Sequence, residues 1–467
     1  LDPAAGSGNF LTETYISLRK LENKIIEAKF GDNQLVISDL NFDELKNPIK
    51  VSLKQFYGIE INDFATTVAR TALWISEDQM MKETSEIIHM PIDFLPLKSF
   101  SNIIEANALE IDWNEVVKAE EVNYIMGNPP FVGARYMTKS QASELKRAFD
   151  IKKSISKLDY VTGWYIKAAK YIKDKCIEVA FVSTNSITQG EQAPILWKEM
   201  INSYDIKINF AYQTFKWNSE ATNKASVYCV IVGLSNNNRK NKFIFDNNKY
   251  KKVENINCYL INAPNVFIEG TSHPIDKKVS PLKTGTRVGA QQYVFTEEEK
   301  NISIKNEPLS EKYFLKYIGG KDFINRKIRY CLYLENAKPS ELRNLPNSMK
   351  LIQEVREIRV NKNHKLKDYP REFVKLTIPE NKYLFIPQVS SERRKYIPIG
   401  YVDKNIIPAD PNFMLDNASE YEFGVLTSNV HMGWMRTVAG RLKSDYRYSN
   451  RIVYNTFPWP NPTEKQK

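Results

Sequence analysis

The chain has 467 residues, of which 42% are hydrophobic, 12% aromatic and 26% charged, and its formal net charge is +11. This length is more than one compact core needs, so two or three domains are expected, and the composition excludes a disordered chain. No apolar run is long enough to cross a bilayer and no signal peptide is visible, so we predict no membrane partner.

The first motif is the turn sequence Asp2-Pro3-Ala4-Ala5-Gly6-Ser7-Gly8, with only Leu1 before it. A parallel strand buried on both faces has about five apolar residues, so we expect the chain to be a piece of a longer protein. Gly6 and Gly8 let the backbone approach a ligand without a Cβ in the way. A tight turn without a ligand would look the same, and Asp2 could bind a ligand amine or cap the turn.

Strands and helices alternate after this turn. Apolar spacing predicts a helix over residues 10–28, with one buried face formed by Leu11, Tyr15, Leu18, Leu21 and Ile25. Strands are predicted at 56–61, 122–126, 177–183, 206–212, 227–234 and 243–245, and further helices at 64–81, 160–172 and 195–201. The alternation predicts an open, largely parallel sheet with helices on both faces.

Two polar residues near predicted strand ends are candidates for cofactor contact. Glu60 ends the second strand, where open α/β sheets place an acid that accepts hydrogen bonds from ribose hydroxyls. A glutamate there is otherwise ordinary, so this assignment depends on Gly6 and Gly8. Asn107, in the loop before the third strand, is equally a cofactor contact or a turn residue.

The sequence Asn128-Pro129-Pro130-Phe131 directly follows a predicted buried strand. Two successive prolines fix φ twice and remove two N–H donors, so the loop presents carbonyl acceptors rigidly. An exocyclic amine on an aromatic ring is a poor nucleophile, and the Asn128 side chain and Pro129 carbonyl could hold its hydrogens and favour a reactive, pyramidal nitrogen. Phe131 would stack on the base. A proline-stiffened turn is the structural alternative.

The excess positive charge lies in the second part of the chain. Residues 270–467 carry 34 Lys and Arg against 22 Asp and Glu, a net +12, whereas residues 1–269 carry 32 against 33, a net −1. This indicates a polyanion-binding module, although a solvated lysine-rich surface would have the same composition. Candidates for contact with phosphates or guanine edges are Arg326, Lys327, Arg329, Arg393, Arg394, Lys395, Arg441, Lys443, Arg447 and Arg451.

We place domains at 1–265, 266–400 and 401–467. The second part is less regular, with predicted strands at 313–318, 328–334 and 383–387 and helices at 348–359 and 422–440, before an extended segment at 451–457. Cys176, Cys229, Cys258 and Cys331 lack zinc spacing, so we expect buried thiols in a reducing cytoplasm and no metal.

Three motifs together resemble those of the adenine-N6 DNA methyltransferases. Residues 2–11 resemble motif I, residues 58–60 motif II and residues 128–131 motif IV. The resemblance implies that Gly6, Gly8 and Glu60 hold S-adenosylmethionine, and that Asn128, Pro129 and Phe131 hold a flipped adenine. We count Pro130 with the catalytic group, and Asp2, Ala4, Asn107 and Asn128 with the cofactor group. Phe215 and Trp217 match the loop that closes over the adenine, and either could be a core anchor instead.

Further runs resemble the MmeI-like single-chain restriction-modification enzymes. They are residues 319–325, 329–332, 440–449 and 454–460. This resemblance implies a Rossmann-like class I S-adenosylmethionine-dependent methyltransferase sheet, then a mixed α+β target-recognition domain from about residue 280 that binds double-stranded DNA. It also implies a bacterial cytoplasmic protein with an upstream endonuclease and helical spacer, and no nuclease motif is visible in these residues.

Two other functions remain open at this stage. Asn-Pro-Pro-aromatic loops also serve methyltransferases that act on protein glutamine or on RNA bases, although such enzymes need no basic module of about 200 residues. A DNA-specificity module with an inactive catalytic domain is the third possibility. Intact Gly6, Gly8, Asn128 and Phe131 count against the loss of catalysis.

Overall fold

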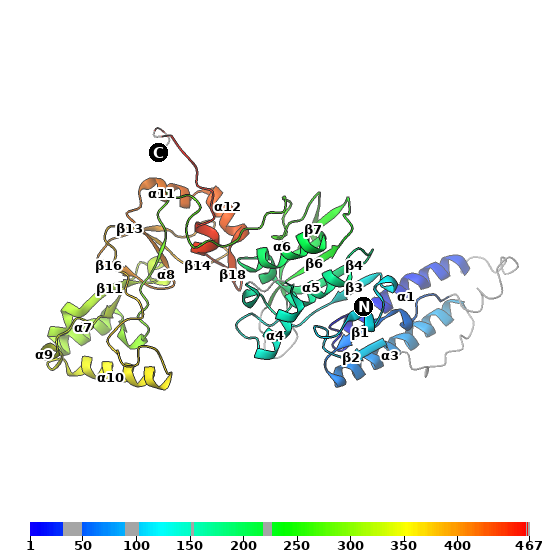
Figure 1. The fold of residues 1–467 in the computed structure, drawn as a ribbon, viewed down its shortest axis with the longest axis horizontal. Helices are drawn as coiled ribbons and strands as arrows, with labels where there is room; N and C mark the ends of the chain where they lie inside the picture. The colour runs from blue at the N-terminus through cyan, green and yellow to red at the C-terminus, as the bar shows by residue number, and fades with distance from the viewer. Residues whose placement is uncertain (31–48, 89–101, 151–153, 218–226, 464, 466–467) are drawn as a thin grey trace. The chain divides into compact units, whose positions relative to one another are not determined.

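The computed structural model describes residues 1–30, 49–88, 102–150, 154–217, 227–463 and 465 (Figure 1). The chain divides into two compact units: Leu1–Thr188 with Gln192–Phe267, and Gln189–Glu191 with Ile268–Lys467. Three residues from within the first unit's sequence therefore belong to the second unit. None of the helices in the described residues is long and apolar enough to span a membrane.

Strands and helices of the first unit alternate along most of its length. The helices are α1 (Asn9–Phe30), α3 (Asp63–Ile88), α4 (Lys139–Ala148), α5 (Thr162–Tyr171) and α6 (Gln192–Tyr204). The strands are β1 (Tyr57–Glu60), β2 (Asn102–Glu105), β3 (Tyr124–Gly127), β4 (Glu178–Thr184), β5 (Lys207–Trp217), β6 (Val227–Ser235), β7 (Lys242–Asp246) and β8 (Lys249–Val253). Each strand predicted in this unit is present, and β2, β8 and α4 are additional.

Leu1 and Asp2 join the β1–β2 pair to the six-stranded sheet, whose order is β3-β4-β6-β5-β7-β8. The Asp2 amide donates to the carbonyl of Tyr57 in β1 at 2.9 Å, and the Met126 amide of β3 donates to the carbonyl of Leu1 at 3.0 Å. The first two residues thus lie as a short strand between β1 and β3. The turn that follows them therefore begins between β1 and β3 within one continuous sheet.

The sheet is only partly parallel. β3 pairs with β4 and β5 with β7 in parallel, but β6 is antiparallel to both β4 and β5, and β8 is antiparallel to β7. A parallel crossover needs about a dozen or more residues, usually including a helix. The connections from β5 to β6 and from β7 to β8 are shorter, so these pairs are antiparallel hairpins.

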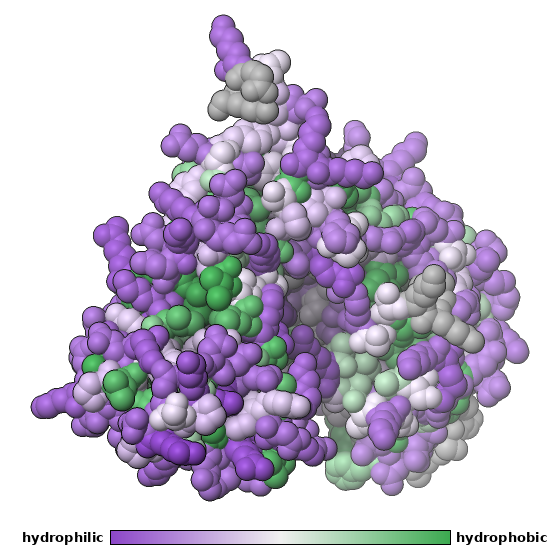
Figure 2. All heavy atoms as spheres, turned by 60° about the vertical axis from the view of Figure 1, so that its left-hand side comes forward, coloured by the Kyte–Doolittle hydropathy of each residue, from purple (hydrophilic) through white to green (hydrophobic). Residues whose placement is uncertain are grey.

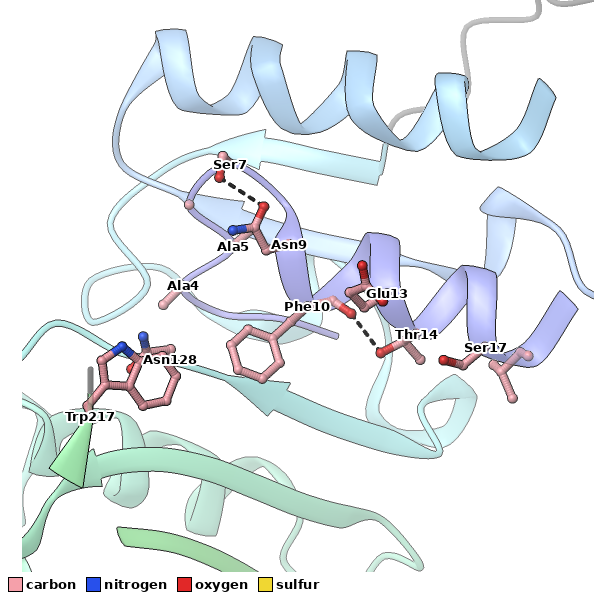
Figure 3. Close-up of a pocket in the computed structure, with 12 residues that line it drawn as sticks. Ala4, Ala5, Ser7, Asn9, Phe10, Glu13, Thr14, Ser17, Asn128 and Trp217 are labelled. Atoms are coloured by element: carbon pink, nitrogen blue, oxygen red, sulfur yellow. Dashed lines mark hydrogen bonds between the residues drawn. The ribbon is translucent and has the colours of Figure 1, made fainter. Parts of the chain in front are cut away.

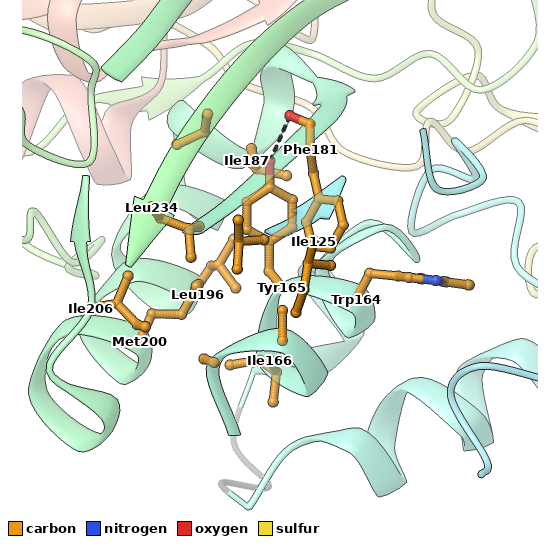
Figure 4. Packing of buried hydrophobic residues seen from close by; sticks show 14 of the residues in the cluster. Ile125, Trp164, Tyr165, Ile166, Phe181, Ile187, Leu196, Met200, Ile206 and Leu234 are labelled. Atoms are coloured by element: carbon orange, nitrogen blue, oxygen red, sulfur yellow. Dashed lines mark hydrogen bonds between the residues drawn. The ribbon is translucent and has the colours of Figure 1, made fainter. Parts of the chain in front are cut away.

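Two hydrophobic clusters cover the two faces of the sheet. Ile103 of β2 belongs to the cluster with α1 and α3, whereas the next residue, Ile104, packs against the larger cluster that includes α5 and α6. Because successive side chains of a strand point to opposite faces, helices cover both faces, as predicted. Figure 4 shows the larger cluster, in which Tyr165 of α5, Phe181 of β4 and Leu196 of α6 are fully buried.

The buried face of α1 differs from the prediction. Three residues expected to be buried are exposed by 42%, 57% and 50%: Leu18, Leu21 and Ile25. The buried stripe runs instead through Leu11, Tyr15, Arg19, Asn23 and Ile26. A buried guanidinium is stable when it is paired, and Arg19 forms an ion pair with Glu22 and donates to Thr84 Oγ1 of α3 at 2.6 Å. The prediction from side-chain polarity therefore assigned the wrong face of α1 to the core.

The second unit contains short strands in three sheets, with orders β10-β12-β11-β16, β15-β13-β17-β9 and β14-β19-β18. The strands are β9 (Lys283–Thr284), β10 (Val294–Phe295), β11 (Phe314–Ile318), β12 (Arg329–Leu332), β13 (Tyr383–Ile386), β14 (Val389–Ser390), β15 (Gly400–Val402), β16 (Ile406–Pro408), β17 (Phe413–Asp416), β18 (Gly440–Leu442) and β19 (Asp445–Arg447). The helices are α7 (Glu297–Asn306), α8 (Gly320–Ile324), α9 (Pro339–Leu342), α10 (Pro346–Asn361), α11 (Glu420–Leu426) and α12 (Asn429–Val438). This is the mixed α+β architecture predicted for the second part.

Three predictions outside the site were wrong. The segment expected to be extended at 451–457 begins as a π-helix over Asn450–Tyr454, because the Ser449 hydroxyl caps it by accepting from the amide of Ile452. The single helix expected over 422–440 is two helices, since Ser428 caps the second by accepting from the amide of His431. Cys176 is exposed in the turn before β4, whereas the other cysteines are buried. The surface in Figure 2 is mainly hydrophilic, with small apolar patches.

Candidate functional site

A cavity of about 670 Å³ lies in the first unit between the glycine turn, the start of α1 and the ends of two strands. Figure 3 shows Asn128, which follows β3, and Trp217, which ends β5, on its wall. Ligand pockets for small molecules typically measure roughly 300–1,000 Å³. The lining residues are Ala4, Ala5, Gly6, Ser7, Asn9, Phe10, Glu13, Thr14, Ser17, Leu18, Asn128 and Trp217.

The glycine turn is held by contacts that need glycine. Gly6 and Gly8 have φ of +54° and +83°, which L side chains rarely adopt. A Cβ on Gly8 would lie 2.9 Å from Cβ of Ala69, so α1 and α3 pack too closely there for any side chain. The Gly6 amide donates to Glu60 Oε2 at 2.8 Å, and the other carboxylate oxygen accepts from the Asn62 amide at 3.0 Å.

Asp2 is buried and does not line the cavity. Its side chain is fully buried, and Oδ1 accepts from the Ala4 amide at 3.0 Å. Burial raises the pKa of this carboxyl to about 7, partly offset by that hydrogen bond. A Cβ on Gly127, the residue before Asn128, would lie only 2.6 Å from Asp2 Oδ1. Asp2 thus packs directly against the start of the Asn-Pro-Pro-Phe loop.

The Asn128 side chain is exposed at the cavity wall, and no described residue hydrogen-bonds with it. Pro129 is buried and Pro130 is exposed, so the loop is anchored on one side and open on the other. Phe131 is partly buried and packs against the larger hydrophobic cluster. The loop therefore offers an unpaired side-chain amide from a rigid, N–H-poor backbone.

Several predicted residues are absent from the cavity wall. Asn107 Oδ1 accepts from the Leu109 amide at 3.0 Å, as in an ordinary turn. Its side chain also forms a hydrogen bond with Glu144. Burial raises the pKa of the Glu144 carboxyl, but the hydrogen bonds that it accepts, this one included, outweigh burial and lower the pKa overall. Phe215 lies in β5 opposite Cys229, with its ring centroid 6.1 Å from that of Trp217.

The first turns of α1 contribute side chains that sequence reasoning missed. Phe10, Thr14, Ser17 and Leu18 line the cavity from one helix face. Their spacing of three and four residues was a signal for such a face. The prediction of a buried Leu18 is wrong: apolar residues at helical spacing are usually buried, but this one faces the cavity.

Two basic residues of the second unit are engaged within the protein. Arg329 Nη2 pairs with Asp322 Oδ2 at 2.7 Å, and its guanidinium lies over the ring of Tyr317. The Arg441 guanidinium carbon lies 3.8 Å from the ring centroid of Tyr446. These contacts give both side chains a structural role that competes with phosphate binding.

Six other candidate DNA-binding residues are exposed, and no described residue pairs with their side chains: Arg326, Lys327, Arg393, Arg394, Lys443 and Arg447. Four of them cluster on one sheet. Arg393 and Arg394 follow β14, Lys443 lies at the turn between β18 and β19, and Arg447 ends β19. Of the remaining two, Lys395 lies over the Tyr396 ring and Arg451 pairs with Glu191 at 3.7 Å.

The fold and this arrangement define a Rossmann-like class I methyltransferase domain followed by a mixed α+β domain. Residues 1–246 match the family model described as the MmeI DNA-methyltransferase domain, and residues 262–461 match the MmeI target recognition domain. The chain therefore belongs to the MmeI family of restriction-modification proteins.

Two relatives cover almost all of this chain. DNA methyltransferase A of Bacillus subtilis (strain 168) is 39% identical over 100% of the chain and 53% of the relative. The solved structure of the type IIL restriction-modification enzyme MmeI in complex with DNA is 42% identical and has a TM-score of 0.91, over 99% of this chain and 62% of that one. The chain thus spans about half to three fifths of the length of these relatives.

Proposed function

We propose that this chain transfers a methyl group from S-adenosylmethionine to the N6 amino group of an adenine extruded from duplex DNA. The observation that carries the proposal is the exposed, unpaired Asn128 side chain on the wall of a cavity that also contains the glycine turn. In the longer protein, the chain would be the methylating and DNA-recognising part of a cytoplasmic restriction-modification enzyme. An endonuclease and helical spacer would precede it.

Groups in and beside the cavity suit S-adenosylmethionine, and Gly8 and Glu60 are beside it rather than on its wall. Gly6 and Gly8 keep two positions of the turn free of side chains, and two backbone amides hold the Glu60 carboxylate at the end of β1. The remaining lone pairs of that carboxylate suit ribose hydroxyls. Phe10 and Leu18 contribute apolar side chains to the wall of the cavity. When bound, the donor supplies an activated methyl group on a sulfonium.

Asn128 and the backbone around it are suited to an exocyclic amine. The Asn128 Oδ1 and the Pro129 carbonyl would accept the two N6 hydrogens, which favours a pyramidal nitrogen with an available lone pair. The nitrogen then bonds to the methyl carbon as the carbon–sulfur bond breaks, and the displaced N6 proton passes to water. Trp217, or Phe131 if its ring turns outward, would stack on the extruded base.

Duplex DNA is favoured as substrate over protein or RNA by the second unit. Arg393, Arg394, Lys443 and Arg447 expose their side chains around one three-stranded sheet, as phosphate-binding surfaces do. A glutamine methyltransferase would need no such surface. The DNA complex of the MmeI relative agrees with this assignment.

The test is methyl transfer from labelled S-adenosylmethionine to duplex DNA, followed by nucleoside analysis and mapping of the methylated positions. N6-methyladenine within a fixed sequence is the expected product. Label on cytosine, on protein, or on no substrate at all would contradict the proposal. Calorimetric titration with the donor alone separates loss of cofactor binding from loss of chemistry.

A further inference from the structure

A buried polar junction lies beside the catalytic loop and is not part of the cavity. Asp159, in the turn before α5, is 6% exposed. Its Oδ1 accepts from the amide of Ala134, three residues beyond Phe131, at 3.0 Å, and its Oδ2 accepts from Thr184 Oγ1 at the end of β4 at 3.2 Å. One carboxylate thus fixes the segment after the Asn-Pro-Pro-Phe loop to the end of β4.

Gln192, the first residue of α6, forms a reciprocal pair with Asp159. Its Nε2 donates to Asp159 Oδ1 at 3.0 Å, and its Oε1 accepts from the Asp159 amide at 3.1 Å. Alongside, the Tyr160 amide donates to the Val132 carbonyl at 2.9 Å. The segment that follows Phe131 is therefore held by backbone and side-chain bonds together.

The same glutamine is covalently joined to the three residues that belong to the second unit. Gly190, with φ of +52°, donates its amide to the Val438 carbonyl at the end of α12 at 3.1 Å. Val438 is followed closely by β18, which begins the hairpin that carries Lys443 and Arg447. Gln192 is thus the residue at which the chain returns to the first unit.

We propose that Asp159 and Gln192 are positioning residues for methyl transfer, which hold the Asn128–Phe131 loop in its reactive geometry from the segment behind it. This inference rests on the proposed function. Neither residue touches the cavity, so they act on the rate of the chemical step and leave the binding of donor and DNA unchanged. Misplacement of a reacting group by about 1 Å can slow a reaction on the order of a hundredfold.

The test compares Gln192→Leu, Asp159→Ala and Asp159→Asn in the protein, with single-turnover methylation at saturating donor and DNA. Gln192→Leu and Asp159→Ala should lower this rate roughly ten- to hundredfold, with the KM for DNA and the Kd for the donor within about threefold of wild type. Asp159→Asn keeps the acceptor for Ala134 and Gln192, so it should retain most of the rate. The control is Gln141→Leu, which removes one hydrogen bond from the start of α4.

Each outcome decides the proposal. A Gln192→Leu rate equal to wild type, or a loss that appears only as a raised KM or Kd, overturns it while leaving the proposed function intact. If Asp159→Ala does not fold, an Asp159→Asn rate as low as that of Gln192→Leu overturns it as well. A wild-type protein that methylates no DNA removes the proposed function and this inference together.

Discussion

The carboxylate of Glu60 accepts a hydrogen bond from the backbone amide of Gly6, with 2.8 Å between Oε2 and the nitrogen. The end of β1 therefore restrains the turn at the start of α1, although 54 residues separate the two. A hydrogen bond to a charged acceptor contributes more stabilising free energy than a hydrogen bond to a neutral one. The turn that lines the cavity is thus held in place by the protein's own side chain.

Glu60→Ala should raise the Kd for S-adenosylmethionine on the order of ten- to a hundredfold, because a hydrogen bond to a charged group contributes about 1.5–3 kcal/mol. Glu60→Gln keeps an acceptor and should have a smaller effect. Calorimetric titration measures both. An unchanged Kd for the alanine variant would remove Glu60 from the cofactor site.

Asn128→Ala should reduce the methylation rate at saturating substrates by about 10²–10³, the usual effect of losing one preorganised group that stabilises a transition state. The exposed Asn128 side chain supports no described part of the fold, so the melting temperature should stay near that of wild type. Single-turnover kinetics and thermal unfolding provide the two measurements. Equal rates for both proteins would end the enzymatic assignment of the loop.

Gly8→Ala should destabilise the first unit by about 1–3 kcal/mol, because it imposes a left-handed conformation on a residue with a Cβ. The new Cβ would also lie 2.9 Å from Ala69. Gly433→Ala in α12 is the matched control: nothing lies within 4 Å of its Cβ, so it should stabilise its helix by about 0.5–1 kcal/mol. Denaturant unfolding distinguishes the two, and similar effects would show that packing at Gly8 is not restrictive.

Arg394→Ala and Lys443→Ala should each weaken DNA binding and reduce the slope of log K against log salt by about 1, as loss of one phosphate contact does. Arg329→Ala should instead lower thermal stability, because its guanidinium pairs with Asp322, and leave the slope unchanged. Binding isotherms at several salt concentrations measure these slopes. Unchanged slopes for both exposed residues would place the DNA elsewhere.

His431 makes the stability of the second unit depend on pH. The ring is fully buried, its Nε2 lies 3.0 Å from the Tyr448 hydroxyl, and burial lowers its pKa to about 4. An unfolded histidine has a pKa near 6.5, so the unfolded state binds the extra proton first. This contribution, on the order of 3 kcal/mol, is present above pH 6.5 and is lost as the pH falls towards 4.

His431→Gln, which keeps a hydrogen-bonding group and does not titrate in this range, should flatten the dependence of the melting temperature between pH 7 and 5. The exposed His273 provides the control, because His273→Gln should leave the pH dependence as it is. Thermal unfolding of the three proteins across this range decides the point. A parallel pH profile for wild type and His431→Gln would contradict it.

The sequence predicted the candidate site best where its residues lie at the ends of strands. Gly6 lies in the turn after the short strand at Leu1 and Asp2, Glu60 ends β1 and Asn128 follows β3. Residues at the carboxyl ends of parallel strands meet at one edge of a sheet. Their proximity was therefore predictable. Phe10 was not, because one aromatic at the start of a helix looks the same whether it faces a ligand or the core.

The fold was predictable where periodicity and connection length agree. The helices on both faces follow from alternating elements, but the face of α1 was misassigned because buried Arg19 breaks the rule that charges stay outside. The segment 451–457 is rich in β-branched and aromatic residues, and the cap at Ser449 overrides that preference. Some signals were present and unused, such as the capping box of Thr296 and Glu299 that starts α7.

Residues Gln189–Glu191 have a practical consequence for engineering by domain exchange. The polypeptide passes between the two units after Thr188, after Glu191 and after Phe267, so the second unit is not a single cassette in the sequence. A graft of residues 268–467 alone would leave the Val438 carbonyl and the Arg451 side chain facing residues of a foreign host. A graft that transfers the second unit should therefore take residues 189–191 from the donor as well as residues 268–467.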